Sequence, residues 1–190
     1  MRRWRKMKVT QAFAVARPPE QVWAFFQDVF SVAQCLPGAE LTGQDEGGAY
    51  EGSLSAKLGP MTATFEGAAT VVSDVVSMSA RIEGKGVDKR GGSRGRAKVD
   101  YAVAAEGAGS KVTVDADIQL SGPAAQFGRT GLINEMAKRL IEDFVDCLEA
   151  KLEAETEEEA AVIEAGEVRG VALLIASLWA WLKRLLKPAS

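Results

Sequence analysis

Residue types that carry out chemistry are scarce in this sequence, and their spacing argues against an active site. The 190-residue chain contains no histidine, so the commonest general base and the commonest transition-metal ligand are both missing. Asp115 and Asp117 alternate with apolar residues and are therefore expected on the solvent side of a strand. No pair of carboxylates falls on an expected inner face, where acid–base catalysis would need one. The sequence predicts a protein that is not an enzyme and binds no metal ion.

The two cysteines, Cys35 and Cys147, lie far apart in the chain. They form no C-x-x-C pair, which redox-active and metal-binding motifs use. We therefore expect two buried thiols in a reducing compartment. The N-terminus is basic but runs into an alternating segment and not into an apolar one, so it does not follow the pattern of a signal peptide and a cytoplasmic protein is expected.

Hydrophobic periodicity predicts the elements that must position any site. Residues 8–16 alternate between apolar and polar types, as in a half-buried strand. Helical spacing begins at Pro19, a residue that the first turn tolerates, and ends at Pro37-Gly38. Residues 39–121 alternate again between turn-forming clusters, which predicts a six-stranded antiparallel meander. From 123 to 152 the period is helical and predicts one long amphipathic helix.

These elements form an α+β layer in which a curved sheet grips the final helix. The length suits one such domain with an appendage. The expected organisation is a basic N-terminal extension (1–7), the domain (8–152), an acidic linker or helix extension (153–167) and an amphipathic C-terminal helix (168–190). The net charge of −3 provides no overall basic field that would attract nucleic acid.

The sheet face that meets the long helix is expected to be rich in small residues, which by alternation are Gly52, Ala56, Ala63, Gly67, Ala69, Ala80, Ala97 and Ala116. A helix packs about 10 Å from a sheet, so small side chains leave volume unfilled. We predict an apolar cavity there; an ordinary core filled by large side chains is the alternative. Gly128 and Gly131 indicate either close backbone approach to a ligand or a late helix start. The residues expected to line the cavity are Phe13, Trp23, Phe26, Phe65, Gly67, Ile82, Tyr101, Phe127, Gly128, Ile133, Met136 and Leu140.

Five short motifs, in this order and spacing, resemble the carbon monoxide dehydrogenase accessory family CoxG of the START-like, SRPBCC superfamily. They are Pro18-Pro19-Glu20-x-Val22-Trp23, Leu36-Pro37-Gly38-Ala39-Glu40, Lys57-Leu58-Gly59-Pro60, Phe65-Glu66-Gly67 and Ala125-Gln126-Phe127-Gly128. The resemblance covers about residues 7–152. It implies a helix-grip fold, with seven antiparallel strands around a long helix and an internal apolar cavity.

The resemblance also implies a function. Proteins similar to this one accompany molybdenum hydroxylase-type carbon monoxide dehydrogenases, and bring them to the membrane or supply a quinone. We therefore expect no covalent cofactor, a bound respiratory quinone (menaquinone or ubiquinone) or another lipid, and a carbon monoxide dehydrogenase-like partner. The alternative is a structural adaptor that recruits the enzyme to the membrane without transferring a ligand. Some START-like relatives are cyclases or hydrolases.

Residues 81–98 form a glycine-rich and strongly basic segment between two predicted strands. The cations are Arg81, Lys85, Lys89, Arg90, Arg94, Arg96 and Lys98, against Glu83 and Asp88. This charge can attract anionic lipid headgroups or an acidic protein partner, or it is simply solvated. The segment is not a phosphate loop, because it opens no helix.

The C-terminal segment 168–187 has the pattern of a helix that lies on a membrane surface. Its longest uncharged stretch, Gly170–Leu182, is 13 residues and too short to span about 30 Å of hydrocarbon. Apolar residues share one helical face, tryptophans flank it and cations lie opposite, as an interfacial helix requires. Docking on a partner enzyme, or folding back over the cavity, are the alternatives. The expected membrane-binding residues are Val171, Leu174, Ile175, Leu178, Trp179, Trp181, Leu182, Lys183, Arg184 and Leu185. They would place the protein on the inner face of the cell membrane.

Overall fold

The computed structural model describes residues 4–58, 60–129, 132–154 and 160–164. The strands are β1 (Arg5–Val15), β2 (Ala39–Gln44), β3 (Tyr50–Leu58), β4 (Met61–Asp74), β5 (Ser79–Asp88), β6 (Ser93–Glu106) and β7 (Gly109–Ser121). The helices are α1 (Pro19–Gln27), α2 (Val29–Gln34), the 3₁₀ helix η1 (Pro123–Arg129) and α3 (Leu132–Glu153).

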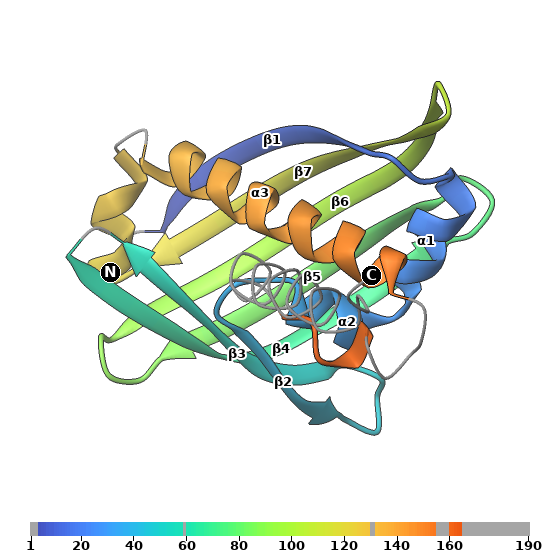
Figure 1. Cartoon of the computed structure of the whole chain (residues 1–190). Helices are drawn as coiled ribbons and strands as arrows, with labels where there is room; N and C mark the ends of the chain where they lie inside the picture. The colour runs from blue at the N-terminus through green and yellow to red at the C-terminus, as the bar shows by residue number, and fades with distance from the viewer. Residues whose placement is uncertain (1–3, 59, 130–131, 155–159, 165–190) are drawn as a thin grey trace, which may run out of the picture.

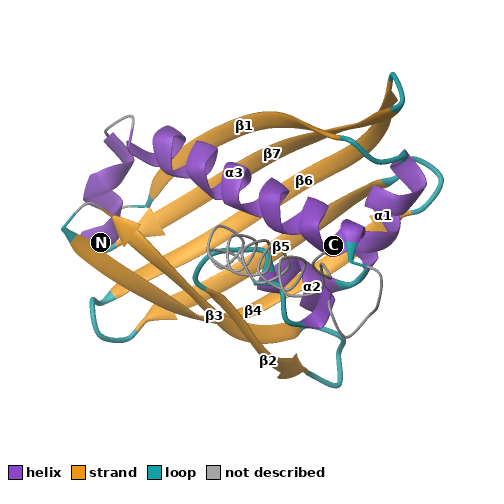
Figure 2. Cartoon of the chain, viewed as in Figure 1, coloured by secondary structure: helices purple, strands orange, loops and turns teal. Residues whose placement is uncertain are grey.

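The strands form one antiparallel sheet in the order β1-β7-β6-β5-β4-β3-β2. The sheet curves around α3, which crosses its concave face (Figure 1). Figure 2 shows the helices on that one side of the sheet, with α1 and α2 near the end of the sheet where α3 finishes. This is the seven-stranded helix-grip arrangement that the sequence predicts, and it follows because each strand has one apolar face to cover.

Three element boundaries differ from the sequence-based expectation. The first strand begins at Arg5, which pairs with Leu120 of β7, so part of the expected N-terminal extension belongs to the sheet. Met78, expected within a strand, lies in the turn before β5 with a φ of 45°, although its side chain still packs on the core. The expected helix 123–152 is divided into η1 and α3, and α3 begins only at Leu132. The helix therefore starts after Gly128, which lies in η1.

The two cysteines are joined to each other, which makes the expectation of free thiols wrong. Cys35 caps the C-terminus of α2, Cys147 lies on α3, and a disulfide bond links them. Both residues are fully buried. Spacing along the chain gave no sign of this pair, because 112 residues separate the two positions and only the helix-grip topology brings α2 against α3.

The chain after α3 folds back toward α2. The ammonium group of Lys151 donates to the side-chain oxygen of Gln34 and to the carbonyl of Ala160, both at 2.7 Å. Ile163 packs against the core. Burial lowers the pKa of Lys151. Within residues 160–164, Ala160 and Ile163 therefore contact the domain, while Val162 is 73% exposed.

Within the described ranges, no helix has the length and hydropathy needed to cross a membrane.

Candidate ligand chamber

The concave side of the sheet holds two separate hydrophobic clusters, one toward each end of α3. The aromatic cluster lies where α1 and α2 meet the sheet, and its rings contact one another: Phe26 stacks on Tyr101 with centroids 4.7 Å apart, and Phe144 of α3 lies 5.7 Å from Phe26. The η1 cluster lies at the other end, around buried Leu58, Leu120 and Ala124. The core is therefore closed at both ends.

Between the two clusters, part of the inner face of the sheet keeps some solvent exposure. Cross-strand pairing places two rows of residues there. One row is Ile118, Ala97, Gly84 and Ala69, and the next is Ala116, Val99, Ile82 and Val71. All eight are apolar and half-buried; Val71 and Ile82 pack against the aromatic cluster and Ile118 packs against the η1 cluster, while the others belong to neither. We call these two rows the chamber floor.

The helix above the chamber floor shows the same partial exposure. Leu140 belongs to the apolar stripe of α3, between Met136 in the η1 cluster and Phe144 in the aromatic cluster, but it is 36% exposed. On the strand side, Leu54 pairs with Phe65 across β3 and β4 and is 43% exposed. The strand that α3 contacts most is β1, at the opposite edge of the sheet from β3. The half of the sheet that holds β3 to β5 is therefore the less covered half.

A row of glycines bends the sheet beside the chamber floor. Gly52, Gly67, Gly86 and Gly95 lie in register across β3, β4, β5 and β6. A Cβ at Gly67 would lie 1.9 Å from the backbone oxygen of Lys85, and one at Gly52 would lie 2.2 Å from that of Glu40. The ring of Phe65 lies beside Gly95, where a Cβ would meet it at 3.4 Å. The row thus lets the strands approach closely and seats Phe65 in the η1 cluster.

The predicted cavity residues occupy three different environments. Trp23, Phe26 and Tyr101 are buried in the aromatic cluster, with Phe13 packed against it, so they close one end of the chamber. Phe65, Phe127 and Met136 belong to the η1 cluster at the other end. Ile82 lies on the chamber floor and Leu140 faces it, while Gly67 is in the glycine row. Gly128 is in η1; Ile133 is in α3, and its side chain lies outside the described part.

The predicted cavity residues do not include Gly84, Gly86 and Gly95. These glycines belong to the segment 81–98, for which the basic residues suggested a binding surface and not a cavity wall. Strand alternation already places Gly84 and Gly86 on the inner face and Lys85, between them, on the outer face. The rows of the chamber floor carry no ionisable side chain. In the described part of the chain, no cluster of His, Cys, Asp and Glu is arranged to hold a metal ion.

Tyr101 gives the aromatic cluster a measurable pH response. Burial raises the pKa of its phenol from 10.0 to about 12. Between these values the unfolded chain releases a proton that the folded chain retains, so stability falls as pH rises from about 10 to 12. Urea unfolding at successive pH values will show this loss in the wild type and a smaller one in Tyr101→Phe. Parallel pH profiles of the two proteins would contradict the burial of this phenol.

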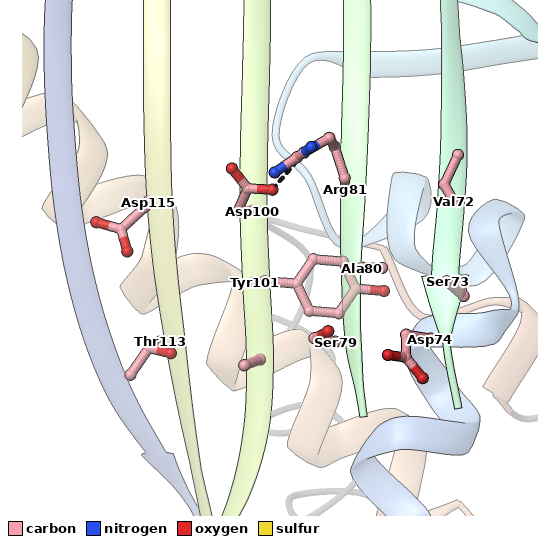
Figure 3. A pocket seen from close by; sticks show the side chains of 11 residues that line it. Val72, Ser73, Asp74, Ser79, Ala80, Arg81, Asp100, Tyr101, Thr113 and Asp115 are labelled. Atoms are coloured by element: carbon pink, nitrogen blue, oxygen red, sulfur yellow. Dashed lines mark hydrogen bonds and ion pairs between the residues drawn. The ribbon is translucent and has the colours of Figure 1, made fainter. Parts of the chain in front are cut away.

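A shallow hollow of about 350 Å³ lies at the other face of the sheet. Figure 3 shows that Arg81 of β5 and Asp100 of β6 point toward each other there, and their ion pair measures 2.6 Å. The neighbouring carboxylate of Asp115 accepts a hydrogen bond from the Thr10 hydroxyl. The hollow is thus lined by charged groups that already have partners within the sheet, and it does not resemble a site for an apolar ligand.

A groove of about 430 Å³ runs between α2 and β2, beside the returning chain at Glu164. Phe30 at its edge is 49% exposed. The predicted membrane-binding residues at 171–185 follow Glu164 in the chain, and they lie outside the described residues.

Solved structures similar to this chain share its fold at low sequence identity. A conserved protein from Geobacillus kaustophilus matches with a TM-score of 0.66 and 16% identity, over 77% of this chain and 95% of the other. A START superfamily protein from Mycobacterium smegmatis matches at 0.52 and 13%, over 78% and 99%. The Zhui aromatase/cyclase from Streptomyces sp. R1128 matches at 0.54 and 13%, over 78% and 94%. These likenesses establish a START-like fold.

Sequence comparison identifies the family. No curated protein sequence matches this chain. The family model of CoxG, described as a subunit of carbon monoxide dehydrogenase, matches residues 12–153. This range extends from within β1 to the last residue of α3 and includes the chamber floor and most residues of both clusters. The chain therefore belongs to the carbon monoxide dehydrogenase CoxG family.

Proposed function

We propose that this protein is a non-enzymatic accessory protein that binds an apolar molecule in the chamber and carries it between a membrane and a carbon monoxide dehydrogenase-type molybdenum oxidoreductase. A respiratory quinone, menaquinone or ubiquinone, is the favoured ligand, and another lipid is the alternative. The observation that carries the proposal is the partial exposure of the chamber floor, eight apolar inner-face residues of which Val71, Ile82 and Ile118 also pack against the two clusters.

The chemistry of the chamber supports an apolar ligand. Exposed apolar surface on an inner face costs free energy, at about 25 cal/mol per Å², and a ligand that covers it recovers that energy. The floor consists of glycine, alanine and branched aliphatic residues, which select by shape and hydrophobicity and not by charge. A flat ring with an isoprenoid chain matches such a surface, because neither part needs an ionic partner.

Family membership supports the choice of partner, since carbon monoxide dehydrogenase is the enzyme that the family name specifies. The C-terminal segment 168–187, which we call the tail, supports the choice of a membrane as binding partner. As a helix, this sequence would have an apolar face flanked by tryptophans and opposed by cations. In this proposal the tail holds the domain on a membrane surface, and the chamber exchanges its ligand there. Among relatives of this fold, an aromatase/cyclase acts as an enzyme, but the chamber floor offers no acid or base for such a reaction.

Filling the chamber should remove the ligand without unfolding the protein. Ala97 lies on the floor beside Gly84 and is half-buried, so Ala97→Phe projects a ring into the unfilled section. We expect the thermal midpoint to change by only a few degrees. The new ring covers exposed apolar surface, and this gain offsets the cost of fitting a larger side chain on the inner face. Apolar molecules extracted by solvent from the purified variant should fall at least about tenfold in mass spectrometry, as expected for a blocked pocket.

The matched control is Ala102→Phe, which introduces the same ring on the opposite face of the same strand, β6. This variant should keep the ligand content of the wild type. If Ala97→Phe unfolds the domain, the section is packed and the chamber does not exist. If it folds and retains all extractable ligand, binding occurs elsewhere, and the adaptor role without ligand transfer becomes the better account.

A further inference from the structure

The outer face of the sheet is divided into a basic end and an acidic end. Pairing aligns Lys6, Gln119, Arg96 and Lys85 in one row across β1, β7, β6 and β5. The next row aligns Lys8, Asp117, Lys98 and Glu83. We define the basic end as Lys6, Lys8, Lys85, Lys89, Arg90, Arg94, Arg96 and Lys98. Farther along the same strands, Asp100 and Asp115 lie directly opposite each other, with Asp74 two strands from Asp100.

Most of the positive charge at the basic end is not neutralised within the domain. Lys8 pairs with Asp117, and Lys89 pairs with Glu66. Among the described residues, no carboxylate forms an ion pair with any of the other six cations. Neighbouring strands are about 4.8 Å apart, so these charges repel one another in the free protein. A surface that supplies anions relieves that repulsion.

An aromatic residue adds an apolar component to the basic end. The guanidinium of Arg96 lies 5.0 Å from the ring centre of Trp4, and Trp4 remains 36% exposed. Val87, on the outer face of β5 opposite Arg94, is 41% exposed. Tryptophan beside cations is the combination that residues at a lipid–water interface show.

The composition favours lipid over a protein or a nucleic acid. Five of the eight cations are lysines, which are depleted in specific protein interfaces but attract an anionic leaflet at about 1 kcal/mol each. A nucleic acid lying along this face would meet Asp74 and Asp115 at its far end, which form no ion pair among the described residues and would repel phosphates, whereas Asp100 is paired with Arg81. A membrane needs to meet only one end of the face, and the acidic end then points away from it.

We propose that the basic end is a lipid-binding surface, separate from the tail, that docks the β5–β6 end of the sheet on anionic headgroups. Because the chamber lies on the opposite face of the same strands, this contact fixes how the chamber is turned relative to the bilayer. The inference concerns residues of the domain only and stands whether or not the chamber holds a quinone.

Charge reversal in the full-length chain tests this surface. Lys6→Glu, Lys85→Glu and Arg94→Glu together remove three unpaired cations that are exposed on the outer face. The partition coefficient is measured by sedimentation with two kinds of vesicle, phosphatidylcholine alone and phosphatidylcholine mixed with phosphatidylglycerol. We expect the triple variant to bind the anionic vesicles roughly 100-fold more weakly, as three lost cations imply. Binding to neutral vesicles, which reports on the tail, should not change.

The matched control is Lys57→Glu, Lys111→Glu and Lys138→Glu, which changes the net charge equally at exposed lysines outside the basic end. It should weaken anionic binding by much less, and both variants should melt near the wild type. Equal effects of the two triple variants, or no effect of the first, would overturn the proposal. Weaker binding to the oxidoreductase with unchanged vesicle binding would overturn it too, in favour of a protein interface. Ligand content of the same samples reports separately on the chamber.

Discussion

Replacing both cysteines with alanine should lower the free energy of unfolding by about 3–5 kcal/mol, because Cys35 and Cys147 close a loop of 112 residues and such a cross-link strongly restricts the unfolded chain. For a domain whose total stability is of order 5–15 kcal/mol, this loss is large. Urea unfolding at neutral pH measures it. The double variant should still fold, since the surrounding contacts of Val22, Phe144 and Leu148 do not depend on the sulfur atoms.

The reduced wild type provides the control for this prediction. Unfolding in the presence of dithiothreitol should bring the wild type close to the double alanine variant, which itself should not respond to reductant. A wild type with the same stability in both conditions would mean that the two cysteines are thiols. In that case the link between α2 and α3 would rest on packing alone.

Gly67→Ala should destabilise the domain by about 3 kcal/mol or more, which is at the upper end of the range for an overpacked site. The added Cβ would lie 1.9 Å from the oxygen of Lys85 and 2.8 Å from the Cα of Gly86. Both are backbone atoms of β5, so relief requires the two strands to separate. Thermal and urea unfolding will both report the loss.

Gly84→Ala is the matched control on the adjacent strand. Its Cβ would meet only the Cβ of Ala69 at 3.5 Å and the oxygen of Ala68 at 3.9 Å, which are ordinary contacts. Its stability should equal or slightly exceed that of the wild type, because alanine restricts the unfolded chain. If the two variants lost equal stability, the glycine row would not be what brings β4 and β5 together.

Much of the fold could be predicted because its residues follow simple periodicities. Strand alternation correctly placed Tyr101 and Ala80 on the inner face, and Pro19 correctly indicated the start of α1. The expectation for α3 was right in type but too long, because periodicity does not register that η1 is a tighter helix. The pairing of Cys35 with Cys147 depends on contacts between elements distant in sequence, which local patterns do not contain.

The chamber could be predicted only in part. Small inner-face residues such as Ala69 and Ala97 indicated unfilled volume, and the floor does remain half-buried. Large aromatic residues such as Trp23 and Phe26, which were expected to line the cavity, each pack against Tyr101 at one end of the chamber floor. Composition indicates how much volume is available, but not which side chains will fill it. That is decided by rotamers and by the angle between helix and sheet.

The most direct test of the account is to identify what the purified full-length protein contains. Native mass spectrometry should show a fraction of the protein carrying extra mass, and solvent extraction should release an apolar molecule, with a prenylated quinone as the expected species. The molecule should be absent from Ala97→Phe and present in Ala102→Phe. A wild type that carries no apolar molecule and fails to bind added menaquinone or ubiquinone would contradict the account.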